Sequence, residues 1–252
     1  MSVEAPPEAS GGPLAGKRIL VSGAGSGLGR AAARLFRQLG AEPVLLGRRL
    51  QALRETLPEA RCEPLDHADP EAVAALAERC PTLDGMFLAA GQLWTGGAVD
   101  TPVEAFDRMI AANLKGPWLL CRHLSPRLVD GASVVLVGSN VGIRPIPDSA
   151  AYCVAKAGLH MLGRVLAQEW ASRRIRVNVL APGPVHTDML EARMQASSDP
   201  AADLARLATV NPLGRLGSAA EIAQVGAFLL GDACPWMTGV ILPVDGGAEG
   251  VL

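Results

Sequence analysis

The sequence has few of the residues that build metal centres, disulfide frameworks or membrane spans. Its four histidines share no ligand spacing and no carboxylate cluster accompanies them, so we predict no metal site. Its five cysteines are scattered, odd in number and without a C-x-x-C pair, which favours reduced thiols in a cytoplasmic protein. No apolar run approaches the roughly 18 residues of a membrane helix. The first residues also lack the basic-then-apolar form of a secretory signal.

Charge of either sign is also limited. The formal net charge is −2 and the sequence has no basic run, which argues against a nucleic-acid partner. A length of 252 residues with 49% hydrophobic content fits one α/β domain whose sheet is buried on both faces. We expect residues 1–16, rich in Pro, Gly, Ser and Glu, to form a flexible arm, and residues 17–252 to form the domain.

Short apolar runs alternate with helical patterns along the chain. The expected strands are Arg18–Ser22, Pro43–Gly47, Arg61–Leu65, Asp84–Ala90, Ser133–Gly138, Arg176–Leu180 and Val240–Val244. The longest expected helices are Pro102–Val129 and Ala150–Ser172. Thr187–Asn211 is expected to be irregular, with a surface helix as the alternative. This alternation predicts a doubly wound α/β fold, in which right-handed crossovers make the sheet parallel.

The only tyrosine of the chain, Tyr152, lies four residues before Lys156, which places both side chains on one face of a helix. A cation near a phenol favours the phenolate and lowers its pKa from about 10 toward neutrality. Ser139 follows a buried apolar run, at the edge where open α/β sheets bind ligands. These groups suit carbonyl/alcohol redox chemistry. The alternative for the Tyr–Lys spacing alone is an ordinary surface pair.

A glycine cluster directly follows the first expected strand and precedes a helix at Arg30–Leu39. Glycines let the backbone turn and approach a pyrophosphate closely, and the helix amino terminus then faces its negative charge. The cluster, Ser22-Gly-Ala-Gly-Ser-Gly-Leu-Gly29, is therefore a candidate dinucleotide site.

Together these motifs resemble the short-chain dehydrogenase/reductase family over nearly the whole chain. The cluster is similar to the family motif T-G-x-x-x-G-x-G, with Ser22 in place of Thr, and Asn113 matches the family's helix asparagine. Ser139, Tyr152 and Lys156 match its remaining catalytic residues. The resemblance implies a seven-stranded sheet in the order 3-2-1-4-5-6-7, and a homotetramer in which the helix bearing His160 packs on a neighbouring subunit.

The resemblance also implies which residues bind a nicotinamide cofactor. From the glycine cluster these are Ser22, Gly23, Gly25, Ser26, Gly27, Leu28 and Gly29; elsewhere they are Arg48, Arg49, Asp66, His67, Ala90, Gly91, Tyr152, Lys156, Pro182, Gly183, Val185 and Thr187. Where the family usually has Asn-Asn-Ala-Gly, this chain has Leu88-Ala-Ala-Gly91, which puts local rigidity and cofactor affinity in question. His67 departs from the aliphatic residue usual at its position.

The second expected strand ends in Gly47 rather than in the carboxylate that selects NAD, and Arg48 and Arg49 follow. A guanidinium group suits a 2′-phosphate. We therefore expect NADP(H), with NAD(H) as the alternative.

Tyr152 is the expected proton donor and acceptor, and Ser139 is expected to bind the reacting oxygen. Largely apolar residues are expected to line the substrate pocket: Gln92, Trp94, Val141, Arg144 and Met189. They favour a small or medium-sized ketone, a ketose or a 3-oxoacyl group. The alternatives are an NAD-dependent alcohol or polyol dehydrogenase, and a non-catalytic nucleotide-sensing protein.

Overall fold

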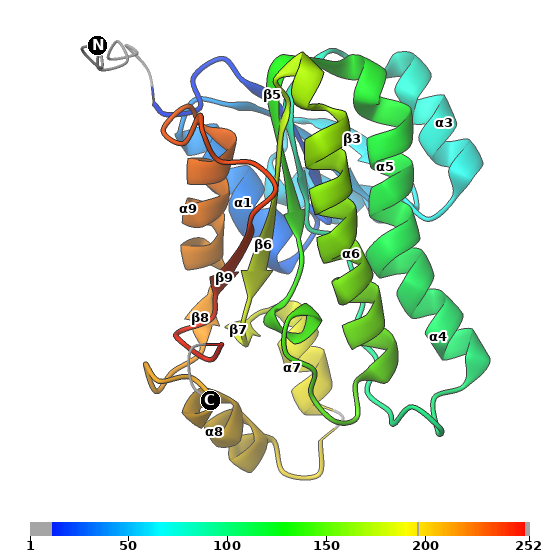
Figure 1. Cartoon of the computed structure of the whole chain (residues 1–252), viewed down its shortest axis with the longest axis vertical. Helices are drawn as coiled ribbons and strands as arrows, with labels where there is room; N and C mark the ends of the chain where they lie inside the picture. Colours follow the sequence, from blue (N-terminus) through cyan, green and yellow to red (C-terminus); the bar gives the residue numbers. More distant parts are fainter. Residues whose placement is uncertain (1–11, 196, 250–252) are drawn as a thin grey trace.

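The computed structural model describes residues 12–195 and 197–249, and most strands of this part form one parallel sheet (Figure 1). The seven strands of the sheet are β1 (Arg18–Ser22), β2 (Glu42–Gly47), β3 (Arg61–Pro64), β4 (Leu83–Leu88), β5 (Leu128–Val137), β6 (Arg176–Pro182) and β9 (Ile241–Val244). They lie in the order β3-β2-β1-β4-β5-β6-β9. This order confirms the expected arrangement, because β9 is the seventh of these strands along the chain. Two short strands, β7 (Val185–His186) and β8 (Gly217–Ser218), pair separately.

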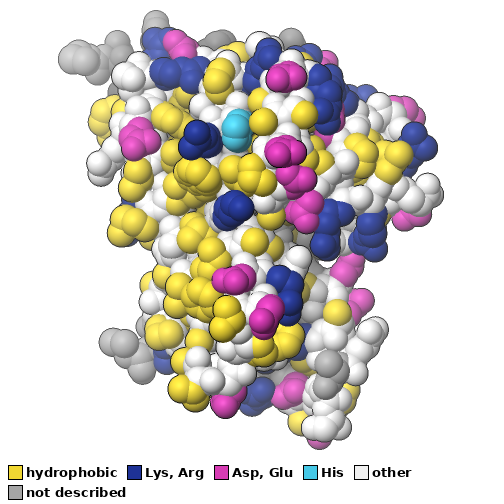
Figure 2. Space-filling model, turned by 90° about the vertical axis from the view of Figure 1, so that its right-hand side faces the viewer, with side chains coloured by type: hydrophobic (Ala, Val, Ile, Leu, Met, Phe, Trp, Pro, Cys, Tyr) yellow, Lys and Arg dark blue, Asp and Glu magenta, His cyan; other side chains and the backbone are white. Residues whose placement is uncertain are grey.

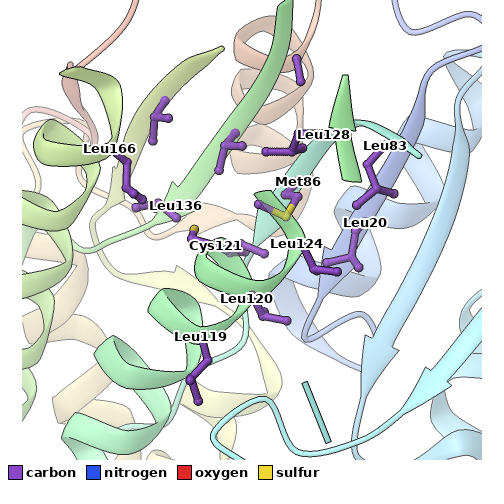
Figure 3. Close-up of a cluster of buried hydrophobic side chains, with 14 of the residues drawn as sticks. Leu20, Leu83, Met86, Leu119, Leu120, Cys121, Leu124, Leu128, Leu136 and Leu166 are labelled. Atoms are coloured by element: carbon purple, nitrogen blue, oxygen red, sulfur yellow. The ribbon is translucent and has the colours of Figure 1, made fainter. Parts of the chain in front are cut away.

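Helices cover both faces of the sheet, and each face has its own apolar core. The helices α1 (Gly27–Gln38), α2 (Leu50–Thr56) and α9 (Ala219–Leu230) cover one face, and α3 (Pro70–Arg79), α5 (Gly116–Leu124) and α6 (Ala150–Glu169) cover the other. Successive strand residues point to opposite faces, so Leu20 joins the core under α5 and Val21 the core under α1. Figure 3 shows Leu124 of α5 beside Leu20 and Met86 of the sheet.

The long helix expected at Pro102–Val129 is found as continuous helical structure from Val103 to Arg127, but it is not α-helical throughout and it ends two residues early. The chain instead forms α4 (Val103–Ile110), a π-helical turn at Ala111–Lys115, α5 and a 3-10 turn at Ser125–Arg127, and β5 already begins at Leu128. Pro117 has no amide hydrogen and is tolerated only in the first turn of a helix, which is where it lies in α5. The proline therefore marks a helix start inside a continuous apolar pattern.

The segment Thr187–Asn211 is not irregular as expected but largely helical, as in the alternative interpretation. It contains α7 (Asp188–Gln195) and α8 (Pro200–Thr209), which lie beyond the carboxyl edge of the sheet (Figure 1). The side chain of Asp199 accepts a hydrogen bond from the amide of Ala202 at 3.0 Å, and proline occupies the first turn of α8. An aspartate followed by proline is a helix-start signal that overrides the polar composition of this segment.

The packed domain begins before Lys17. Leu14 is fully buried against the α1 side of the sheet, and its amide donates to the carbonyl of Leu39 at 3.1 Å. The expected flexible arm therefore cannot extend to Gly16, and its remainder, residues 1–11, lies outside the described residues. Among the helices of the described residues, none is long and apolar enough to cross a membrane.

Candidate functional site

The site lies where the carboxyl ends of four strands meet. Ser22 ends β1, Gly91 follows β4, Ser139 follows β5 and Pro182 ends β6. The strand order reverses between the neighbours β1 and β4, and open parallel sheets bind ligands at such a reversal. The fold thus brings together motifs that are more than 150 residues apart in the sequence.

The glycine cluster forms a close turn between β1 and α1 that admits no side chain at two positions. Gly23 has a φ of +71°, and a Cβ atom there would lie 2.8 Å from the amide nitrogen of Ala90. A Cβ atom on Gly29 would lie 2.3 Å from the carbonyl oxygen of Gly23. The amino terminus of α1, at Gly27, opens onto this turn. Such a bare backbone at a helix amino terminus fits a pyrophosphate.

The end of β4 lacks the two amides of the usual motif, but the strand ends stay linked. The hydroxyl of Ser22 accepts a hydrogen bond from the amide of Ala90 at 3.1 Å, which ties β1 to the segment after β4. Leu88 is buried in the core under α5 and replaces an amide side chain with apolar packing.

The predicted adenine side of the site is formed by the ends of β2 and β3. Gly47 ends β2, and both Arg48 and Arg49 after it are exposed. Asp66 is exposed and accepts a hydrogen bond from the amide of Ala68 at 2.9 Å. His67 is buried, and its Nε2 atom lies 2.9 Å from the carbonyl oxygen of Ala112, a contact directed toward the π-helical turn.

Sequence reasoning missed Arg30, the first residue after the glycine cluster. Its guanidinium donates to the carbonyl of Gly25 at 2.5 Å, and its Nε atom is buried without a partner among the described residues. A cation is thereby held against the glycine turn. The signal in the sequence was its place in the first turns of α1, next to a predicted anion site.

Asn113 is fully buried in the π-helical turn and bonded on both sides of its amide. Its Nδ2 atom donates to the carbonyls of Gln92 and Met109, each at 3.0 Å, and its Oδ1 atom accepts from the amide of Gln92 at 3.2 Å. A Cβ atom on Gly91 would lie 2.6 Å from Oδ1 and 3.7 Å from the Nζ atom of Lys156. Asn113, Gly91 and Lys156 are therefore immediate neighbours.

Ser139, Tyr152 and Lys156 also come together, since α6 begins beside the loop that follows β5. The hydroxyls of Ser139 and Tyr152 share a hydrogen bond. The Nζ atom of Lys156 lies 5.6 Å from the centre of the Tyr152 ring and donates to the carbonyl of Val137 at 2.8 Å. No sequence pattern points to Val137, because the bond uses its backbone carbonyl.

Burial dominates the titration of the tyrosine and the lysine. It raises the pKa of Tyr152 to about 12, against the lowering effect of the Ser139 hydrogen bond. It lowers the pKa of Lys156 to about 8, since a charge is costly away from water. The expected lowering of the Tyr152 pKa by Lys156 is therefore not found at this separation, at which the ammonium group bonds to Val137 instead.

Contrary to what the resemblance implied, the burial of His160 does not depend on a neighbouring subunit. The imidazole is buried within the chain, and its Nε2 atom accepts a hydrogen bond from the amide of Ser139 at 3.4 Å. Burial first, and then the charges of Lys156 and Arg164, lower the pKa of His160 to about 4. A neutral imidazole thus lies directly behind the loop that carries Ser139.

The segment after β6 faces the glycine turn. The side chain of Thr187 lies 3.6 Å from where a Cβ atom of Gly27 would be. Gly183 passes so close to Asp245 that a Cβ atom there would lie 2.7 Å from the aspartate Cβ. Pro182 and Val185 lie on the same segment, the first at the end of β6 and the second in β7. This segment therefore lies against the glycine turn at Thr187.

Of the predicted substrate residues, Gln92 and Val141 contact the catalytic candidates directly, and the other three lie in different settings. The backbone of Gln92 is bonded to Asn113, and the amide of Val141 lies 3.4 Å from the hydroxyl of Ser139. Arg144 donates to the carbonyl of Ala248 at 3.4 Å, which ties its loop to the carboxyl-terminal segment. Trp94, with the guanidinium of Arg108 5.9 Å from its ring centre, and Met189 in α7 are partly exposed.

Comparisons with known proteins match most of the chain. A sequence profile described as "Enoyl-(Acyl carrier protein) reductase" matches residues 23–249. The chain is 36% identical over 242 residues to carbonyl reductase family member 4 of Danio rerio, covering 91% of this chain and 97% of that protein. It is 30% identical over 247 residues to the 2,5-dichloro-2,5-cyclohexadiene-1,4-diol dehydrogenase LinX of Sphingobium indicum, covering 93% and 96%. A short chain dehydrogenase family protein from Francisella tularensis has a TM-score of 0.89 at 26% identity, covering 94% of this chain and 100% of that one.

These matches extend over the glycine turn, the π-helical turn and α6 alike. The relatives are named as oxidoreductases and dehydrogenases, and the family uses a nicotinamide nucleotide as its cofactor. The chain belongs to the short-chain dehydrogenase/reductase family.

Proposed function

We propose that this protein is an NADP(H)-dependent oxidoreductase that interconverts a carbonyl group and a secondary alcohol. The observation that carries the proposal is the cluster in which Lys156 lies between the Tyr152 ring on one side and Gly91 with Asn113 on the other, while Ser139 lies beside Tyr152. A hydroxyl, a phenol, an ammonium and an amide at one sheet edge form a complete set for binding and protonating a carbonyl oxygen. A nucleotide-sensing protein without turnover has no need of all four groups.

In reduction, Ser139 donates a hydrogen bond that fixes the carbonyl oxygen of the substrate, and Tyr152 transfers its proton to that oxygen. The pKa of Tyr152, about 12, keeps the phenol protonated at neutral pH and so available as a donor. Asn113 anchors a water that links Lys156 to solvent and returns the proton. Lys156 lowers the pKa of Tyr152 only if its ammonium leaves the Val137 carbonyl and approaches the phenol.

The residues at the sheet edge fit the family's cofactor. The turn at Gly23 and Gly29 would hold its pyrophosphate and Asp66 its adenine. Lys156 and the segment from Pro182 to Thr187 would hold its nicotinamide end. When bound, this group supplies or accepts the hydride.

NADP(H) is preferred because Gly47 leaves no carboxylate at the end of β2 to repel a 2′-phosphate. The exposed guanidinium groups of Arg48 and Arg49 are available to bind one. Arg30 adds a further cation at the glycine turn.

The substrate is a small or medium-sized ketone, a ketose or a 3-oxoacyl group. Val141 lies beside Ser139, the apolar side chains of Trp94 and Met189 are exposed, and one relative is named a carbonyl reductase. The name of the diol dehydrogenase relative favours a second candidate, the oxidation of an alcohol or diol with NAD. Helices α7 and α8 lie where a lid over this substrate would close.

The protein is proposed to act in the cytoplasm as a homotetramer of single-domain subunits. Hydrophobic side chains gather on the face formed by α4, α5 and α6 (Figure 2). Phe106, Trp118, Val154, Met161 and Val165 on these helices are all exposed. An isologous contact across this face and a second one at the carboxyl-terminal segment would give dihedral symmetry. Residues 250–252 of that segment lie outside the described residues.

The test follows the absorbance of NADPH and NADH with a panel of ketones, ketoses, 3-oxoacyl thioesters and diols. Tyr152→Phe removes only the proton donor, so it should abolish turnover while leaving the dissociation constant for NADPH, measured by fluorescence, nearly unchanged. Substantial reductase activity in Tyr152→Phe would refute the assigned chemistry. Absence of turnover across the whole panel in the unmodified protein, with tight NADPH binding, would favour the sensing alternative.

A further inference from the structure

The π-helical turn before α5 leaves one backbone carbonyl without a main-chain donor. In an α-helix the carbonyl of Ala112 would accept from the amide of Gly116, but that amide donates to Ala111 instead. With the π-helical spacing of five residues, the donor for Ala112 would be residue 117, which is a proline and has no amide hydrogen. The turn and the proline together remove both regular partners.

His67 supplies the missing donor from a different part of the fold. Its Nε2 atom lies 2.9 Å from the Ala112 oxygen, so Nε2 carries the hydrogen and donates it. The ring enters a space that exists only because residue 116 is glycine, since a Cβ atom there would lie 2.2 Å from the ring Cδ2 atom. His67 is 6% exposed, which makes the contact a buried one. A buried carbonyl without this donor would carry the cost of an unsatisfied acceptor.

The bonded carbonyl belongs to the residue immediately before Asn113. The Asn113 amide is held at Gln92 and Met109, and its Oδ1 atom lies against Gly91. These contacts leave little space for displacement, so a shift of the turn at Ala112 would move the amide out of its bonds. The position of the Asn113 side chain thus depends on His67, which follows β3.

We propose that His67 is a positioning residue that fixes the π-helical turn and so holds Asn113 in the active site. It joins this turn to the loop of Asp66 on the adenine side. The proposal goes one step beyond the proposed function and rests on it, because it assigns the support of a group that the proposed chemistry uses. An aliphatic residue at position 67 fills the space but supplies no donor.

The test compares His67→Val, His67→Gln and a second-site change, Pro117→Ala. Valine removes the donor, whereas glutamine returns an N–H group near the position of Nε2. Pro117→Ala gives residue 117 an amide hydrogen with the five-residue spacing to Ala112, so it should compensate within the His67→Val background. Pro117→Ala alone is the matched control and should behave as the unmodified protein.

We expect His67→Val to lower kcat about tenfold, a change equal to about 1.4 kcal/mol in the barrier, with a smaller change in the KM for NADPH. Both His67→Gln and the His67→Val/Pro117→Ala pair should recover most of this loss. A second readout needs no cofactor: hydrogen exchange of the amides in residues 111–118 of the apo-protein should be faster in His67→Val and slower again in the pair.

The proposal is overturned if His67→Val keeps the kcat and the exchange rates of the unmodified protein. It is also overturned if its losses are recovered neither by His67→Gln nor by Pro117→Ala, because the imidazole would then act by packing alone. Asn113→Ala separates this proposal from the proposed function. If Asn113→Ala retains full kcat, the assigned role of Asn113 is wrong, while the exchange measurement still decides whether His67 holds the turn.

Discussion

A single methyl group added at Gly91 should disable the site without touching Ser139, Tyr152 or Lys156. The Cβ atom of Gly91→Ala would lie 2.6 Å from Oδ1 of Asn113, whereas ordinary contacts begin at 3.4 Å. Asn113 must therefore move by about 0.8 Å, and its amide is the part that has to give way. Gly91 does not have a positive φ, so alanine itself causes no backbone strain there.

The magnitude follows from the bonds that Asn113 makes. Its side chain has three hydrogen bonds to backbone groups of Gln92 and Met109, and each is worth about 1 kcal/mol. Losing one to three of them costs about 1–3 kcal/mol of folding free energy, or roughly 2–10 °C in the melting temperature of a chain this long. A displacement of this size in a positioned group should also lower kcat about 10- to 100-fold.

The assay pairs thermal unfolding with steady-state kinetics on the best substrate of the panel. Gly217→Ala is the control, because its Cβ atom would meet Val185, an expected cofactor contact, at the ordinary distance of 3.4 Å and would leave Asn113 untouched. It should change neither kcat nor the melting temperature by much. If Gly91→Ala behaves like Gly217→Ala, Asn113 has more freedom than its contacts indicate and the reasoning fails.

Three further predictions concern stability, cofactor choice and assembly. Burial lowers the pKa of Lys156 to about 8 from 10.5. Below pH 8 the charged ammonium group therefore lowers the free energy of unfolding by about 3 kcal/mol. This cost disappears as the pH rises from about 8 to 10.5, because the folded chain loses the proton first. Lys156→Met should therefore be inactive yet melt at a higher temperature than the unmodified protein at pH 7. This difference in melting temperature should shrink toward pH 10. A lower melting temperature of Lys156→Met at pH 7 would contradict the prediction. NADPH should be preferred to NADH by roughly one to two decades in kcat/KM, and the preference should weaken at high salt. Gly47→Asp with Arg48→Ala should reverse the preference, and the new side chain can be accommodated because its Cβ atom comes closest to the side-chain end of Leu53, at 3.2 Å. Equal kcat/KM for the two cofactors in the unmodified protein would show that Arg48 points into solvent. Light scattering at micromolar concentration should give the mass of a tetramer, and a monomeric mass would remove the proposed role of the face at Trp118.

Much of the fold and the outline of the site are written in the sequence, because they depend on local signals. Apolar runs bounded by glycine placed β1 at the predicted residues, and they placed the other six strands of the sheet to within a few residues except for the start of β5. The spacing of Tyr152 and Lys156 put both on one face of α6, since four residues make about one helical turn. The glycine cluster likewise located the turn between β1 and α1. At Gly23 and Gly29 the backbone passes so close to other backbone atoms that only glycine fits.

The tertiary structure decided everything that depends on contacts between distant segments. The π-helical turn at Ala111–Lys115 is stabilised by His67, which lies 45 residues from Ala112 in the sequence. No pattern within the helix indicates that hydrogen-bond donor. The bond from Lys156 to Val137 uses a backbone carbonyl, which is the same in every residue type. Burial raises the pKa of Tyr152, and packing places His160 against the amide of Ser139. Both effects come from the assembled core and not from either residue alone. The sequence by itself therefore determined which groups are present and which strand end each lies near. Only the packed chain determined their hydrogen-bond partners and their protonation. The reason is that desolvation and hydrogen bonding act through neighbours that only folding brings together.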